Sequence, residues 1–66
     1  MDSVEKAKIR IEHWIDHGDH HIEEYLNFAG QLEQAGAIES AGHIREMIRL
    51  NQKSTECLKK ALTALK

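Results

Sequence analysis

The sequence predicts an all-α protein, an antiparallel two-helix hairpin of long helices that is expected to dimerise into a four-helix bundle. Three observations support this fold class. The 66 residues contain no proline, apolar residues recur at alternating spacings of three and four, and one glycine-containing break divides that pattern into two halves. No linker, repeat or low-complexity tract interrupts either half, so residues 1–66 are expected to form a single helical-hairpin domain.

The first helix is expected over about residues 3–34. Asp2 can cap its first turn, and Glu5 stands three residues later, as in a capping box. One row of positions would then face a single partner helix, and we call this row the seam. In the first helix the seam comprises Val4, Lys8 or Ala7, Ile11, Ile15, Gly18, Ile22, Tyr25, Ala29 and Leu32. Trp14 and Leu26 would widen the apolar surface beside it.

A turn at about residues 35–38 separates the two helices. Gly36 can adopt the left-handed conformation that ends a helix, and Gly42 is a second candidate for that role. The second helix is expected over about residues 38–65, because the alternation resumes there. Its seam comprises Ala41, Ile44, Ile48, Asn51, Thr55, Leu58, Leu62 and Leu65. A link this short makes the two helices antiparallel neighbours.

The centre of the seam is small and polar, because hairpin pairing sets Gly18 beside Thr55 and Ile22 beside Asn51. Two interpretations are open. Asn51 and Thr55 could fix the register and the oligomeric state, as single polar seam residues do in coiled coils. Alternatively, Gly18 could thin the packing and admit a ligand beside the histidines.

Length and composition limit the partners. A chain of this length buries only about 60% of the surface that its unfolded form exposes, so a second copy is expected to complete the core. A net charge of -2 and a pI of about 6.2 provide no basic field for phosphates, which argues against nucleic acid. Because no apolar run reaches the roughly 18 residues of a membrane span or resembles a signal peptide, we expect no membrane contact and a cytoplasmic location.

The two halves of the chain carry opposite charge. Residues 1–34 hold three basic and eight acidic residues, a net charge of -5, and residues 35–66 hold six basic and three acidic residues, a net charge of +3. The two helices should therefore attract each other when they fold together. The single Cys57 has no second cysteine for an internal disulfide or a thiolate metal site.

Four of the five histidines cluster in the stretch HWIDHGDHH, from His13 to His21. The pairs His13–His17 and His17–His21 are four residues apart, so they share one helix face, and Glu24 follows on the same face. Zinc, nickel and similar divalent ions favour such nitrogen and carboxylate ligands. The sequence therefore predicts a metal site made of His13, His17, His21 and Glu24, with zinc or nickel as the candidate ion and no other cofactor.

One straight helix cannot close this site, because His13 and His21 lie about 12 Å apart along its axis. We expect the missing ligands from a second copy. An antiparallel mate with its twofold axis near Gly18 would bring the partner's His21 and Glu24 to the first two histidines of this chain. Such a dimer would hold two sites, each with three histidines and one glutamate.

The remaining histidines are poorer candidates. His20 is less well placed on the face, and His43 lies near the turn in the second helix. Imidazole groups in general titrate near neutral pH, so a cluster of them could also form a proton-sensitive seam, which would compete with metal for the same nitrogens.

The motif has a counterpart in known proteins. HWIDHG at residues 13–18, followed by His21 and Glu24, resembles small uncharacterised prokaryotic helical-hairpin proteins with an HWI(D/E)HN motif and later His and Glu at the same spacing. The resemblance implies that His13, His17, His21 and Glu24 are the residues common to these proteins and that His20 is an additional histidine. Gly18 stands where asparagine is expected, so an amide that could orient a ligand would be absent.

These residues suggest two classes of function and argue against a third. We expect a metal-binding helical hairpin of otherwise unknown function, suited to storing, delivering or sensing the ion. The alternative is a structural or protein–protein interaction module with no bound metal, whose histidines form a polar border. An enzyme is not expected, because the sequence has no nucleophile elbow or phosphate loop and two helices offer little concave pocket.

Overall fold

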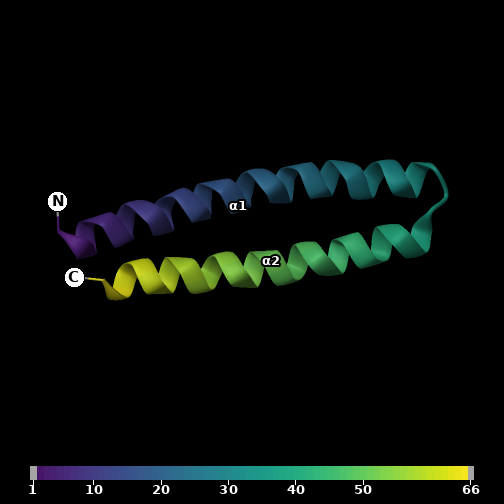
Figure 1. Ribbon diagram of the computed structural model, residues 1–66. Helices are drawn as coiled ribbons and strands as arrows, with labels where there is room; N and C mark the ends of the chain where they lie inside the picture. Colours follow the sequence, from purple (N-terminus) through teal and green to yellow (C-terminus); the bar gives the residue numbers. More distant parts are fainter. Residues whose placement is uncertain (1, 66) are drawn as a thin grey trace.

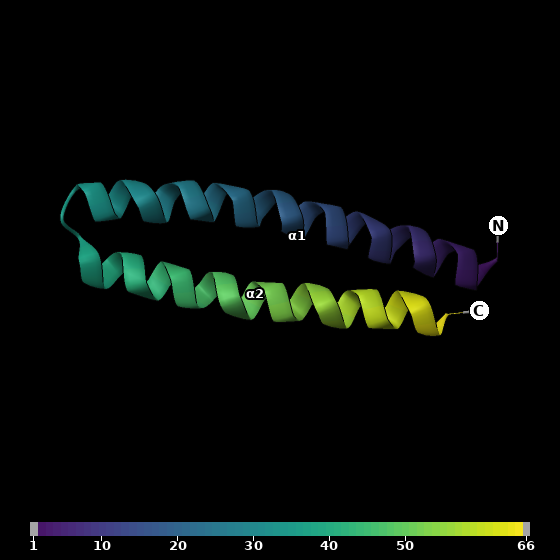
Figure 2. The same cartoon turned by 180° about the vertical axis from the view of Figure 1, so that it is seen from behind.

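A computed structural model gives the structure of the protein and describes residues 2–65. Two antiparallel helices, α1 (Ser3–Gln34) and α2 (Ile38–Ala64), lie side by side, and the described residues form no strand (Figure 1). The start of α1 and the end of α2 lie at one end and the turn at the other, as the view from behind also shows (Figure 2). The hairpin measures 51 × 16 × 11 Å, so it is a single layer of two helices. The predicted all-α hairpin is confirmed.

Helix α1 begins and ends at the predicted signals. Asp2 caps α1, because its side-chain Oδ1 accepts a hydrogen bond of 2.8 Å from the backbone N–H of Glu5. After α1, Gly36 adopts a φ of +82°, the left-handed conformation expected of it. Gly42, the second candidate for the turn, lies inside α2 and does not end a helix.

Two backbone hydrogen bonds close the end of α1 around this glycine. The N–H of Gly36 donates to the carbonyl of Glu33 at 3.0 Å, and the N–H of Ala37 donates to the carbonyl of Leu32 at 2.8 Å. This pair of bonds is the Schellman arrangement, which satisfies carbonyl groups that the helix end would otherwise leave free. The chain therefore reverses in three residues.

The predicted seam forms the contact between α1 and α2. Its buried members are Ile22, Ala29, Ala41, Ile48 and Thr55. Most other seam positions are half-buried, since only one neighbouring helix covers them. Burial is most complete near the turn, where the small Ala29 and Ala41 are 0% and 1% exposed.

Three apolar residues expected on or beside the seam are exposed instead. Val4 is 36% exposed, Trp14 is 51% exposed and Leu26 is 43% exposed. The helical angle of each residue was predicted from the sequence, but a single layer has no third element above or below it to cover the sides of the helices. The apolar surface that Trp14 and Leu26 add therefore faces outward.

The polar side chains at the centre of the seam form hydrogen bonds within α2. The Thr55 hydroxyl donates to the Asn51 carbonyl at 3.1 Å, and the Asn51 amide donates to the Met47 carbonyl at 3.0 Å. A Cβ atom placed on Gly18 would lie 3.4 Å from the Thr55 hydroxyl oxygen, so the predicted pairing of these two residues is confirmed. The space beside Gly18, where one interpretation of the sequence expected a ligand, is bordered by the Thr55 side chain.

An ion pair that the sequence did not predict joins the helices near the turn. The Arg45 guanidinium donates two hydrogen bonds to the Glu33 carboxylate, at 2.9 and 2.8 Å. The hydrogen bond from Arg45 lowers the pKa of Glu33, and the same bond raises the pKa of Arg45. Within α2, Arg49 pairs in the same way with Glu46.

In residues 2–65, neither helix combines the length and the apolar character needed to cross a membrane.

Candidate metal-binding site

The predicted ligands His13, His17 and His21 stand on successive turns of α1 and form a continuous row. The ring centroids of His13 and His17 are 5.6 Å apart, with the rings stacked at 24°. Those of His17 and His21 are 4.6 Å apart, with the rings nearly perpendicular at 87°. His13 and His17 are exposed and His21 is half-buried, so solvent reaches the row along its length. We call these three residues the histidine row.

Tyr25 extends the row by one turn. Its ring stacks on that of His21 with a centroid distance of 5.9 Å and an angle of 13°. Tyr25 was predicted only as a seam residue, and it is half-buried there. The signal that could have shown the second contact is its spacing of four residues from His21, because side chains so spaced meet on a helix surface.

Glu24 lies beside the last histidine of the row. Its carboxylate oxygen Oε2 is 3.8 Å from Nδ1 of His21, which is longer than a hydrogen bond but close enough for electrostatic attraction. The side chain of Glu24 is 72% exposed, against 45% for His21. This carboxylate is therefore free to turn toward an ion or toward another chain.

The other two histidines stand apart from the row. The ring atom Nδ1 of His20 lies 2.9 Å from the backbone carbonyl oxygen of Asp16, to which it donates when it carries the proton. That hydrogen bond is the main cause that raises the pKa of His20, and the nearby carboxylates of Glu23, Asp16 and Asp19 raise it further. His43 lies in α2 and is exposed.

A single chain does not gather a complete metal site. Among residues 2–65, no three side chains of histidine, cysteine, aspartate or glutamate come close enough together to hold one ion. The physical reason is the helical rise, which separates His13 from His21 by about 12 Å along α1. One chain can therefore offer pairs of imidazoles from the histidine row, and any further ligand must come from outside it.

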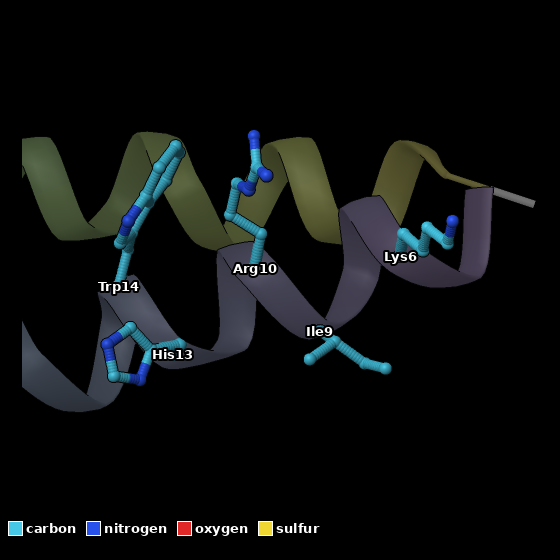
Figure 3. A pocket seen from close by; sticks show the side chains of 5 residues that line it. All are labelled: Lys6, Ile9, Arg10, His13 and Trp14. Carbon is cyan, nitrogen blue, oxygen red and sulfur yellow. The ribbon is translucent and has the colours of Figure 1, made fainter. Parts of the chain in front are cut away.

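A shallow hollow adjoins the first residue of the row. It is lined by Lys6, Ile9, Arg10, His13 and Trp14, all from α1 (Figure 3). Trp14 and Arg10 extend toward α2, whereas Ile9 and His13 lie on the side of α1 that faces away from it. Because every lining residue comes from one helix, the hollow is open to solvent.

Comparisons with known proteins give one result. A family model described as "Domain of unknown function (DUF8180)" matches residues 7–65, which include both helices and the whole histidine row. No curated protein and no solved structure matches the chain.

Proposed function

The chain belongs to the DUF8180 family, and we propose that it is a metal-binding helical hairpin whose histidine row takes up a divalent transition ion such as zinc or nickel. The observation that carries the proposal is the spacing of the rings. With metal–nitrogen bonds of about 2.0–2.1 Å and a tetrahedral angle, two imidazoles that share an ion have centroids roughly 5 Å apart. The two centroid distances in the row, 5.6 and 4.6 Å, lie on either side of that value.

His17 is the central ligand in this proposal. It is a member of both pairs, His13–His17 and His17–His21, so an ion bound at either pair needs it. Two imidazoles spaced by four residues on a helix are a common part of zinc sites. They leave about two coordination positions for other ligands.

We propose that a second copy supplies those ligands. The midpoint of α1 falls between Gly18 and Asp19, so two α1 helices that overlap along their full length share a twofold axis there. The axis brings the partner's His21 and the partner's Glu24 opposite the first two histidines of this chain. The exposure of Glu24 supports the arrangement, because its carboxylate is 72% exposed and its contact with His21 of the same helix, at 3.8 Å, is longer than a hydrogen bond.

Metal binding by the histidine row in such a dimer should depend on pH. Metal binding needs neutral imidazoles, so protons and metal compete for the nitrogens of the histidine row. Uptake should be strong above neutral pH and decline in mildly acidic solution, where imidazoles in general are protonated.

The alternative proposal is an interaction module with no bound metal. One observation favours it: large apolar side chains stand exposed on both helices, including Ile9 at 55% and Leu50 at 53%. Exposed apolar surface of this kind marks contacts with other proteins. The histidine row would then be a polar border of the contact.

Titration calorimetry with zinc and with nickel distinguishes the two proposals. The parent should bind about one ion per chain, His17→Ala should bind at least about tenfold more weakly, and the control His43→Ala should match the parent. Equal losses in the two variants would indicate nonspecific binding by surface histidines. No heat of binding in the parent would leave the interaction module as the function.

A further inference from the structure

The two broad faces of the hairpin differ in chemistry, and one of them carries charges of both signs. Glu33 and Arg45 pair across the helices on this face. Farther from the turn, Asp19 of α1 and Glu56 and Lys59 of α2 line a common hollow on the same side. The opposite charges of the two helices thus meet within the chain, and this face needs no partner.

The opposite face is apolar and aromatic. At about 100° per residue, Trp14, His21 and Phe28 lie on one side of the seam residue Ile22, and the acidic Asp19 lies on the other side. Half-buried residues of α2 continue the surface. We call it the apolar face; its main residues are Trp14, His21, Tyr25, Phe28, Met47 and Leu58. One charged residue stands at the N-terminal edge of this face: Arg10 lies about five turns before Phe28 on α1 and lines a hollow together with Trp14.

The largest side chains of the apolar face are only partly covered by their own chain. Trp14 is 51% exposed and Phe28 is 49% exposed. Trp14 and Phe28 are two heptads apart on α1, so they stand in line along the helix. Such a line of large apolar groups is the pattern by which a helix packs against a further helix rather than against water.

The hairpin exposes more surface than a compact protein of its mass, and the excess is similar to the area that one partner buries in a standard interface. A compact protein of 7.6 kDa exposes about 4,300 Å². The hairpin exposes 5143 Å², an excess of about 850 Å². One partner in a stable protein–protein interface of standard size buries about 800 Å².

From these observations we propose that the apolar face is an interface with a second copy of this chain, which stacks face to face on the first to give a four-helix bundle. A second copy fits because it covers the apolar face along its whole length and leaves both charged faces in water. With the twofold axis at the midpoint of α1, Trp14 lies opposite the part of the partner's α1 that holds the partner's Tyr25. His17 and His21 then flank the axis.

This inference specifies the partner that the proposed metal site uses, but it does not depend on the metal. The apolar face is buried by apolar contact, which operates with or without an ion. Measurements in a chelating buffer therefore test the interface separately from metal binding.

The first test is the solution mass by sedimentation equilibrium in a chelating buffer. We expect twice the 7.6 kDa of one chain for the parent. Phe28→Glu places a charge on the apolar face and should raise the dimer dissociation constant by about 100-fold or more. Leu26→Glu is the matched control, because Leu26 is 43% exposed on the same helix but lies outside the apolar face, and it should stay dimeric. The inference would be overturned if the parent were monomeric at about 100 µM, or if both variants raised the dissociation constant equally.

A second test uses the parent alone, so it does not depend on the folding of a variant. Trp14 is the only tryptophan of the chain and lies on the apolar face. Its fluorescence emission should move to longer wavelength as the protein is diluted through the dissociation constant. A dimer whose Trp14 emission does not change on dissociation would show that the copies meet elsewhere.

Discussion

Replacing Gly18 with alanine should stabilise the hairpin, although Gly18 lies in the seam between the helices. A glycine inside a helix costs about 0.5–1 kcal/mol relative to alanine, because its backbone loses more freedom on folding. The new methyl group would meet the Thr55 hydroxyl oxygen at 3.4 Å, an ordinary van der Waals distance. The free energy of unfolding should therefore rise by about 0.5–1 kcal/mol, which corresponds to a melting temperature higher by roughly 2–8 °C.

Thermal unfolding followed by circular dichroism at one fixed protein concentration measures this change. Gly30→Ala is the control, because Gly30 lies in the same helix and an added Cβ there would meet nothing within 4 Å. Both variants should melt above the parent by similar amounts. A Gly18→Ala protein that melts below the parent, while Gly30→Ala melts above it, would refute the seam geometry.

Two further predictions concern the contact between the helices. Leu58→Asp puts an unpaired charge into the seam and should lower the free energy of unfolding by at least about 2 kcal/mol, measured by urea denaturation; an unchanged denaturation midpoint would contradict the seam assignment of Leu58. Glu33→Gln removes the carboxylate that pairs with Arg45 and should destabilise the fold at neutral pH. Because Arg45 lowers the pKa of Glu33 in the fold, the contribution is complete above the pKa of an unfolded glutamate and is lost as the pH falls through the lowered value. Denaturation of parent and variant should thus differ at pH 7 and converge in acid below the lowered pKa of Glu33, and a difference that persists there would have another cause.

The two boundaries of α1 could be predicted because each depends on a local signal. Asp2 caps α1 through its own side chain, and Gly36 ends it because glycine adopts the left-handed conformation without steric cost. The seam followed in the same way from the spacing of small and apolar residues, including the pairing of Gly18 with Thr55. These features need only neighbours along the chain or the antiparallel geometry of a short turn.

Other features of the structure could not be predicted from the spacing of residues along the sequence. The pair of Glu33 and Arg45 requires two long side chains from different helices to choose matching rotamers. The exposure of Trp14 depends on how many layers the structure has, which helical periodicity does not reveal. The sequence predicted that the histidines share a face, but not that Tyr25 stacks against their last member.

The most direct test of the metal proposal is the metal content of the untagged protein as purified, by plasma mass spectrometry. Parent, His17→Ala and His20→Ala should be compared, because His20 lies in the same helix but its ring is hydrogen-bonded to Asp16. The proposal predicts close to one zinc or nickel ion per chain in the parent and in His20→Ala, and little in His17→Ala. Equal metal content in all three proteins, or none in the parent after growth with added zinc and nickel, would contradict it.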